Sequence, residues 1–332
     1  MTPDPIDIVV PWVDGGDPFW QAERAQAAPE RDGDSGVARY REWGFFRYWF
    51  RSISRYASWV RRVHLITWGH LPPWLNTDHP ALHIVNHRDY IPAEYLPTFN
   101  SHTIELNLHR IPGLARQFVY FNDDVYLTAP TRPADFFRQS LPVDAAVLGR
   151  VSIADRHSYM PYLYLNMLGC INEIFSKSRA IYRHPGKWLN LRYGKGLLRN
   201  VYLLPGRGIP GFQNFHSCLP YTVDTLQQVW AAFPEELDRT CRHRFRSRED
   251  VNQYLFRYWR LMRGEFMPGK PKACWLTIGE DGPEIIRRAL HSRRWRVVCL
   301  NDDPVSGAVW EQRQQLAKLL EEKFPCTCPF ER

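Results

Sequence analysis

The sequence predicts an α/β fold with a largely parallel central sheet and a second lobe that is mainly helical. Two observations lead to this fold class. Short apolar runs alternate with amphipathic segments through the first half, which is the pattern of strand–helix–strand units. The second half changes to segments rich in arginine and aromatic residues, and the chain closes on one more apolar run. We therefore expect an α/β core over 1–150, a basic lobe over 151–295, and a strand and helix in 296–332 that complete the core.

The predicted strands are apolar runs bounded by turn residues. In chain order they are Ile6–Val10, Val63–Thr67, Leu82–Val85, Phe118–Phe121 and Arg296–Leu300. Parallel strands leave their carboxyl ends at one edge of the sheet, and ligands bind beyond that edge in open α/β folds. Residues that follow these strands are therefore the first candidates for a functional site.

The predicted helices follow from apolar residues at helical spacing. This spacing is clear over 43–56, and Ser101 is expected to cap a helix that runs to Leu108. Helical patterns also cover 223–263 and about 307–323.

Composition limits the class of protein. The 332 residues include 44% hydrophobic and 23% charged residues, a globular balance that excludes a disordered or collagen-like chain. The seven cysteines never show Cys-x-x-Cys spacing, so we expect no structural zinc site and a reducing, cytoplasmic compartment. No secretory signal is visible, and no apolar stretch reaches the roughly 20 residues of a membrane span.

The formal net charge of +8 is concentrated in the second half. Residues 177–207 carry eight Lys or Arg and no acid, which would attract a polyanionic product or the anionic inner face of the plasma membrane. An ordinary solvated surface is the alternative. Residues 239–263 carry eight Arg with aromatic residues among them, but no zinc-finger, ribonucleoprotein or Walker A motif accompanies them, so no specific nucleic-acid partner is expected.

Acidic triplets follow two of the predicted strands. Phe118–Phe121 runs into Asn122-Asp123-Asp124, and Val297–Leu300 runs into Asn301-Asp302-Asp303. Acidic clusters at the ends of buried strands are costly without compensation, and carboxylate and amide oxygens suit Mg²⁺ or Mn²⁺. An Asx turn or a helix cap is the alternative for each triplet. The acidic turn after the first strand, which contains Asp14 and Gly15, would face the same edge.

Histidine and arginine supply further candidates. His216 lies in an aromatic loop, where a neutral imidazole can deprotonate a sugar hydroxyl. His102 and His109 could equally be packing residues, and the residue types alone do not choose among these histidines. Arg244 and Arg246 could clamp a diphosphate, or they could belong to a solvated basic surface.

Four segments together resemble the Stealth family. Ile6–Gly15 resembles its first signature block and Cys299–Asp302 its fourth. The third is similar to Asn214–His216 with Phe245-Arg246 and the aromatic segment that follows. The second and longest is similar to Arg41–Gly44, Ile66–Gly69, Leu96–Ser101, Glu105–Arg110 and Phe121–Asp124. These enzymes are sugar-1-phosphate transferases of bacterial capsule and cell-surface polysaccharide synthesis, related to the animal enzyme that adds N-acetylglucosamine 1-phosphate to lysosomal glycoproteins.

The resemblance implies a glycosyltransferase-A-like, Rossmann-like core, a divalent metal and a UDP-sugar donor such as UDP-GlcNAc. A hydroxyl of a glycan or lipid-linked glycan would attack the phosphorus that carries the sugar, and UMP would leave. Such phosphoryl transfer needs positioning and charge neutralisation, which acidic clusters with Mg²⁺ and arginine clamps provide.

The resemblance also assigns roles to single residues. His216 is implied as the general base, Asp123 as a further catalytic residue and Arg246 as a phosphate clamp. The implied ligands of metal and diphosphate are Asp123, Asp124, Asn301 and Asp302. The implied substrate-binding residues are Asp14, Gly15, Asn100, Ser101, Glu105, His109, Arg110 and Arg244.

Two other functions stay open at this point. A conventional glycosyltransferase on the same fold would attack the anomeric carbon and release UDP. A basic, non-catalytic protein would bind polyanions or membrane surfaces, and its binding would survive the loss of Asp123.

Overall fold

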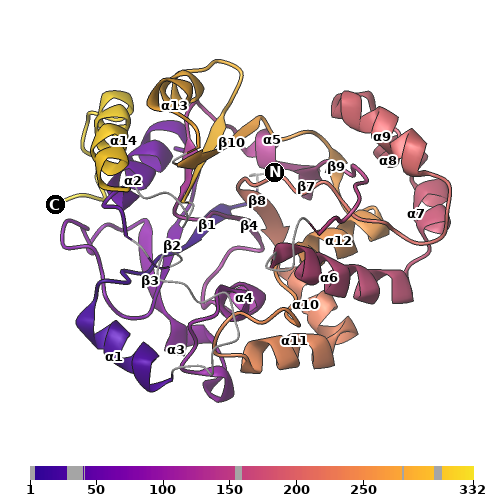
Figure 1. Cartoon of the computed structure of the whole chain (residues 1–332), viewed down its shortest axis with the longest axis horizontal. Helices are drawn as coiled ribbons and strands as arrows, with labels where there is room; N and C mark the ends of the chain where they lie inside the picture. The colour runs from indigo at the N-terminus through magenta and orange to yellow at the C-terminus, as the bar shows by residue number, and fades with distance from the viewer. Residues whose placement is uncertain (1–3, 28–39, 41, 154–158, 279, 303–308) are drawn as a thin grey trace.

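Figure 1 shows the chain as a computed structural model. The structure describes residues 4–27, 40, 42–153, 159–278, 280–302 and 309–332. Arg41, Asp303 and the predicted start of the last helix near residue 307 lie outside these ranges. Within them, no helix combines the length and the apolar character needed to cross a membrane.

The central sheet is largely parallel, as predicted. Its five strands lie in the order β3-β2-β1-β4-β8. They are β1 (Ile6–Pro11), β2 (Val63–Thr67), β3 (Leu82–Asn86), β4 (Gln117–Tyr120) and β8 (Leu219–Thr222). The first four are parallel, and β8 joins β4 antiparallel at the edge. The order reverses beside β1, where the chain returns from β3 to β4, and such switch points are where α/β sheets bind ligands.

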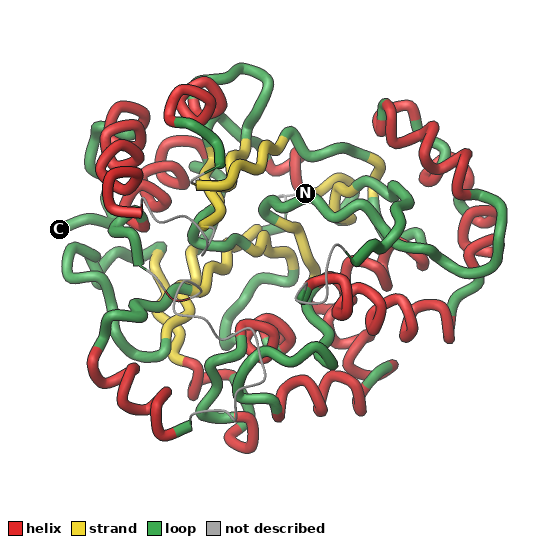
Figure 2. Tube along the Cα trace, in the orientation of Figure 1, coloured by secondary structure: helices red, strands yellow, loops and turns green. Residues whose placement is uncertain are grey.

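Alternate residues of the strands pack into two separate cores. Val9 points into one core and Ile8 and Val10 into the other, because successive side chains of a strand face opposite sides of the sheet. Both faces are therefore covered, which explains why these strands read as continuous apolar runs. Figure 2 shows helices on both sides of the strands.

Helices from the second half cover most of one face. The first core joins them to the shorter helices after β3. They are α3 (His87–Tyr90), α4 (Ser101–Leu106), α6 (Met160–Ile174), α7 (Lys177–Arg183), α8 (Pro185–Trp188), α9 (Lys195–Leu203), α10 (Val223–Ala232), α11 (Pro234–Arg242) and α12 (Tyr254–Arg263). The helix predicted from Ser101 ends earlier than expected, at Leu106, and its N-cap is Asn100 rather than Ser101.

A second sheet and three helices cover the other face. Strands β10 (Ala273–Ile278), β11 (Val297–Asp302) and β5 (Val125–Leu127) form this sheet in the order β10-β11-β5. Helices α2 (Phe46–Tyr56), α13 (Pro283–Leu290) and α14 (Val309–Lys323) lie beside it (Figure 1). The remaining elements are α1 (Pro18–Gln26), α5 (Pro133–Phe136), β6 (Phe137–Arg138), β7 (Leu141–Asp144) and β9 (Met267–Pro268).

All three predicted segments contribute strands to these two sheets. The basic lobe at 151–295 is mainly helical, but its β8 joins the central sheet and its β10 pairs with β11. The closing strand β11 does not enter the central sheet, because it pairs antiparallel with β5, the strand that follows the Asp123-Asp124 turn. The acidic ends of β4 and β11 are therefore brought together by the short turn that leads from β4 in the central sheet to β5 in the second sheet.

The predicted helical stretch 223–263 is three helices with a loop at 243–253. Two arginines of the last helix, Arg257 and Arg260, are fully buried and both donate to Asp144, at 2.9 and 2.6 Å. Burial alone would raise the pKa of Asp144, but these two guanidinium groups hold it below its ordinary value. These arginines therefore form a structural ion-pair cluster, and they belong neither to a solvated surface nor to a nucleic-acid interface.

Candidate active site

A cavity of about 550 Å³ opens beyond the carboxyl ends of β1 and β4 and beside the end of β11. It brings together eight of the residues to which the family resemblance assigns a role: Ser101, Glu105, Asp123, Asp124, His216, Arg246, Asn301 and Asp302. Much of the remaining lining is aromatic: Trp12, Trp20, Tyr40, Trp43, Phe45, Phe46, Phe99, Tyr120, Tyr126, Tyr164, Tyr254 and Trp275. Flat apolar walls with a few convergent polar groups are typical of a small-molecule site.

The Asp123-Asp124 turn lies where β4 ends. Asn122 accepts a hydrogen bond from Val125 N–H at 3.2 Å, which closes the turn, and Asp124 O accepts one from Leu300 N–H at 3.0 Å. The second bond ties the turn to β11. Burial and the charges of Asp124 and Glu42 raise the pKa of Asp123 well above its ordinary value. Burial also raises the pKa of Asp124, and one of its oxygens, Oδ1, is buried without a hydrogen-bond partner among the described residues.

The second acidic cluster lies at the end of β11. Asn301 and Asp302 pair in register with Thr277 and Ile278 of β10, and both line the cavity. Trp43 Nε1 donates to Asp302 Oδ2 at 3.0 Å. The two clusters, separated by more than 170 residues in the chain, thus face one cavity, as the sequence pattern predicts.

His216 and Cys299 flank Asp124. One ligand atom from each of these three residues lies within 4.8 Å of the others. The Cys299 thiol donates to Asp124 Oδ2 at 3.3 Å, and burial together with the Asp124 charge keeps the pKa of this thiol well above its ordinary value, so it stays protonated. His216 is exposed at the mouth of the cavity, with its ring 6.4 Å from that of Trp275.

Arg246 reaches the cavity from the loop between α11 and α12. Its Nη2 donates to Ser101 Oγ, at the start of α4, at 2.8 Å. The loop is held from within by Asp250, which is fully buried and accepts from His102 Nδ1 at 2.9 Å and His243 Nδ1 at 2.6 Å. Burial would raise the pKa of Asp250, but the hydrogen bonds from these two histidines outweigh the effect of burial, and the pKa is lowered.

Asn100 belongs to this support and does not line the cavity. Its side chain accepts from His102 N–H at 3.0 Å and donates to Asp250 Oδ2 at 2.9 Å, with longer contacts to two carbonyls of the Arg246 loop. Every polar atom of this buried amide is therefore used within the protein. Asn100 therefore supports the loop that carries Arg246 and is not among the residues that line the cavity.

Glu105 lies in the wall between the sheet and α12. Burial raises its pKa, and Tyr120 donates to its Oε1 at 3.2 Å. Since Glu105 also lines the cavity, it remains a candidate for contact with a polar group of the substrate.

Asp14 and Gly15 shape the wall without lining it. Asp14 Oδ1 accepts from Gly16 N–H at 2.8 Å, and its own N–H donates to His70 Nε2 at 2.7 Å. Gly15 lies against the backbone of Tyr40, where a side chain would collide with the Tyr40 carbonyl. The turn therefore holds the neighbouring aromatic residues in place.

Three other predicted residues lie away from the cavity. His109 packs against Trp230 with ring centroids 6.0 Å apart, and burial with the charge of Arg110 lowers its pKa to about 4. Arg110 covers the same Trp230 ring at 5.2 Å. The side chain of Arg244 is exposed, and its carbonyl accepts from Phe99 N–H at 2.8 Å. The geometry gives none of these three a contact with a ligand in the cavity.

The chain matches three regions of a known family. They are described as Stealth protein conserved region 1 over residues 4–32, conserved region 2 over 39–143, and conserved region 3 over 216–258. The three regions contain Asp123, Asp124, His216 and Arg246.

Bacterial relatives match along nearly the whole chain. The capsular polysaccharide phosphotransferase WcwK of Streptococcus pneumoniae is 37% identical, over 98% of this chain and 99% of the relative. The receptor polysaccharide phosphotransferase WefC of Streptococcus oralis is 36% identical over 90% of both chains. The exopolysaccharide phosphotransferase cps2G of Lactiplantibacillus plantarum is 34% identical, over 99% of this chain and 97% of the relative.

Among solved structures, the chain is similar to mouse xyloside xylosyltransferase 1 in its apo form. The TM-score is 0.40 with 10% identity, over 90% of this chain and 98% of the mouse chain. The three conserved regions and the full-length bacterial relatives establish that the chain belongs to the Stealth family.

Proposed function

We propose that this phosphotransferase transfers a sugar 1-phosphate from a UDP-sugar to a hydroxyl of a glycan or lipid-linked glycan, with release of UMP, in the synthesis of a capsular or cell-surface polysaccharide. The relatives named above are polysaccharide phosphotransferases, and the chain matches them over 90% or more of their length, which supports the reaction class. The observation that carries the proposal is the single cavity shared by two acidic clusters, Arg246 and His216. A non-catalytic binding protein would have no use for this arrangement.

The acidic clusters fit a divalent cation. Asp123, Asp124, Asn301 and Asp302 present oxygen atoms, the donors that Mg²⁺ and Mn²⁺ prefer. Burial raises the pKa values of Asp123 and Asp124, and the buried Asp124 Oδ1 has no hydrogen-bond partner among the described residues, so a bound cation would stabilise their charged forms. We propose that these four residues hold Mg²⁺ or Mn²⁺, which when bound would neutralise charge on the donor's phosphate oxygens.

His216 is placed to act as the general base. An acceptor hydroxyl beside its ring would lose its proton to the imidazole while the oxygen forms a bond to the sugar-bearing phosphorus. The bond from that phosphorus to the UMP oxygen breaks in the same exchange, and UMP leaves. The nearby Asp124 carboxylate would stabilise the imidazolium that results.

Arg246 and the aromatic walls would position the donor. Arg246 donates to Ser101 Oγ and lines the cavity, and a planar guanidinium suits the oxygens of a phosphate group. Trp12, Phe46 and the other ring side chains offer flat surfaces on which a uracil base or a sugar can stack. The Asp250 cluster keeps the Arg246 loop in place before the donor arrives, which reduces the entropy lost on binding.

Product analysis tests the proposal. The purified chain is incubated with a panel of UDP-sugars, UDP-GlcNAc first, and a glycan acceptor, with Mg²⁺, Mn²⁺ or a chelator, and the products are identified by mass spectrometry. UMP and a phosphodiester-linked product are expected with metal and not with chelator. Release of UDP would instead identify a conventional glycosyltransferase and refute the proposal.

Two variants sharpen this test. Asp123→Asn and Arg246→Ala should abolish UMP release while the urea unfolding midpoint stays near that of the wild type. Arg242→Ala is the matched control, since Arg242 is exposed and pairs with Asp238 outside the cavity. Equal loss of activity in Arg242→Ala would show that the effect is not specific to the cavity.

A further inference from the structure

A basic arm extends from the protein away from the catalytic cavity. We define the arm as residues 176–207, which include α7, α8 and α9 at the right edge of Figure 1. Eight Lys or Arg and no acid occur in 177–207. Six of the basic side chains are exposed and form no ion pair within the described part of the chain: Arg179, Arg183, Arg192, Lys195, Arg199 and Arg207. The arm therefore presents uncompensated positive charge to its surroundings.

The arm also exposes large apolar side chains. In α9 the buried residues are Asn200 and Leu203, whereas Leu198 and Tyr202 are 72% and 70% exposed. Lys195 and Arg199 are exposed on the same side of this helix, because residues three or four apart share a face. A helix on the surface of a water-soluble domain normally turns its apolar side chains inward. The outward face of α9 is thus apolar and basic together.

The same combination recurs on the rest of the arm. Tyr182 of α7 and Leu191 are each 85% exposed, and each lies beside an exposed arginine, Arg183 or Arg192. Scattered single apolar residues on a surface are ordinary, but four of them in a short acid-free segment form a pattern.

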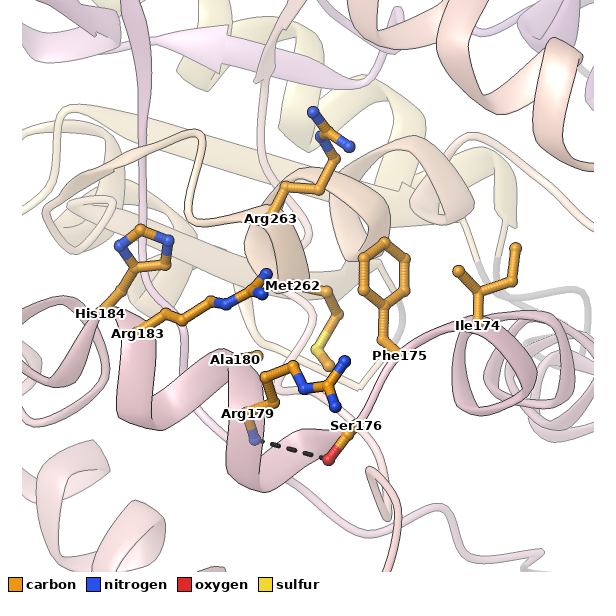
Figure 3. Close-up of a pocket in the computed structure, with 9 residues that line it drawn as sticks. All are labelled: Ile174, Phe175, Ser176, Arg179, Ala180, Arg183, His184, Met262 and Arg263. Carbon is orange, nitrogen blue, oxygen red and sulfur yellow. Dashed lines mark hydrogen bonds between the residues drawn. The ribbon is translucent and has the colours of Figure 1, made fainter.

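A basic pocket lies at the base of the arm. It has a volume of about 310 Å³ and lies between the end of α6, α7 and the end of α12. Figure 3 shows Arg179, Arg183 and His184 along one side and Met262 and Arg263 on the other. Arg263 pairs with Glu265 at 2.6 Å, whereas Arg179 and Arg183 have no acidic partner among the described residues. The pocket is of the size and charge to receive a phosphate group.

We propose that the arm docks on the surface of an anionic lipid bilayer. The apolar side chains of α7, α9 and Leu191 would enter the headgroup region, the exposed basic side chains would bind lipid phosphates, and the pocket would take one headgroup. Interfacial helices combine these two contributions, apolar burial and attraction to anionic lipid. A soluble polyanion would explain the charge of the arm but would leave its apolar side chains in water.

Helix α6 connects this surface to the catalytic cavity. Its first residue, Met160, lines the cavity, and its last, Ile174, lines the basic pocket. A helix of 15 residues spans roughly 20 Å, so the cavity would lie at about that distance from the docked pocket. An acceptor carried on a membrane lipid would then be within reach of His216.

Vesicle flotation with the full chain tests the proposal. The vesicles contain phosphatidylcholine alone, or phosphatidylcholine with a minor fraction of phosphatidylglycerol. Binding is expected to the anionic vesicles only and should weaken at physiological ionic strength. Arg179→Glu/Arg199→Glu should weaken binding at least about tenfold, since each reversal replaces an attraction to the anionic lipids by a repulsion. Leu198→Ser/Tyr202→Ser should also weaken it about tenfold through the lost apolar burial.

Matched variants outside the arm are the controls. Arg88→Glu/Arg132→Glu changes the net charge equally at exposed positions, and Phe19→Ser/Ile285→Ser removes two other exposed apolar side chains. Both should bind like the wild type. Failure of the wild type to float with anionic vesicles would overturn the proposal, and so would wild-type binding by either arm variant. If the wild type does not float with the vesicles, and if Leu198→Ser/Tyr202→Ser binds soluble polyphosphate as well as the wild type does, the arm binds a soluble polyanion instead.

Discussion

The Asp7 carboxylate ties together the strands that carry the site, and its replacement by Asn should destabilise the protein in a pH-dependent way. Asp7 is fully buried in β1. Its oxygens accept from Arg61 Nε at 2.8 Å, Arg61 Nη2 at 2.6 Å, His64 Nε2 at 2.8 Å and Ala115 N–H at 2.8 Å. His64 belongs to β2, and Ala115 precedes β4. One charge thus links the three strands next to the switch point.

The size of the effect follows from the pKa of Asp7. Burial would raise this pKa, but the hydrogen bonds from Arg61, His64 and Ala115 lower it from 3.8 to about 2. A carboxyl whose pKa is lower in the folded state stabilises the fold above its unfolded pKa, and this contribution is lost as pH falls from about 4 towards 2. The difference of about 1.8 corresponds to about 2 kcal/mol. At neutral pH, Asp7→Asn should cost about 3–5 kcal/mol, since it removes one partner of a buried ion pair.

Urea unfolding followed by tryptophan fluorescence measures this effect at a series of pH values. The difference in free energy of unfolding between wild type and Asp7→Asn should be largest from pH 5 to 7 and should shrink by about 2 kcal/mol as the pH falls through 4 towards 2. Asp78→Asn, which changes an exposed carboxylate, should show no comparable loss. A difference that is constant with pH, or that grows on acidification, would refute the reasoning.

Three further predictions concern the cavity. His216→Ala should lower kcat for UMP release by about 10²–10⁴-fold, the range for a lost general base. His291→Ala, which changes an exposed histidine, should leave kcat unchanged. A His216→Ala variant as fast as the wild type would exclude His216 as the general base. Cys299→Ala removes the thiol that donates to Asp124, so the Mg²⁺ concentration for half-maximal activity should rise about tenfold. Cys299→Ser keeps a donor at this position and should show the wild-type Mg²⁺ requirement. The same Mg²⁺ requirement in both variants would contradict this role of Cys299. Asn100→Ala removes a hydrogen-bond donor from a buried carboxylate and two backbone carbonyls. The free energy of unfolding, measured in urea, should therefore fall by about 1–3 kcal/mol. An unchanged unfolding midpoint would contradict this prediction.

The strands and the meeting of the acidic clusters could be predicted because both depend on local pattern. Val63–Thr67 is a strand with the predicted bounds, since an apolar run between turn residues has few alternatives once both faces are covered. Asp123 and Asn301 face one cavity because each lies at the carboxyl end of an apolar run, Asp123 in the turn after β4 and Asn301 in the last residues of β11. The strand that β11 pairs with could not be predicted. The acidic end of β11 reaches the cavity because β11 pairs with β5, and no local sequence signal marks this partner.

Features that depend on distant contacts could not be predicted. Strand β8 contains Pro220, which indicates a loop in isolation and is tolerated only because β8 is an edge strand. The support of Arg246 by Asp250 and Asn100 joins residues 150 positions apart. Cys299 gains its role only from the carboxylate on the neighbouring turn. His109 stands in a recognisable motif, yet Trp230, far along the chain, occupies the space on which its side chain packs.

The hydrogen bond from Leu300 N–H to Asp124 O joins two parts of the site that are synthesised at different times. Two of the four proposed cation ligands, Asn301 and Asp302, belong to β11, which the ribosome makes only after more than 290 residues have been joined. A nascent or prematurely terminated polypeptide that stops before Val297 contains Arg246 and the residues of β1 and β4 but lacks Asn301 and Asp302. Under the proposed function, turnover would therefore require a chain translated at least as far as Asp302.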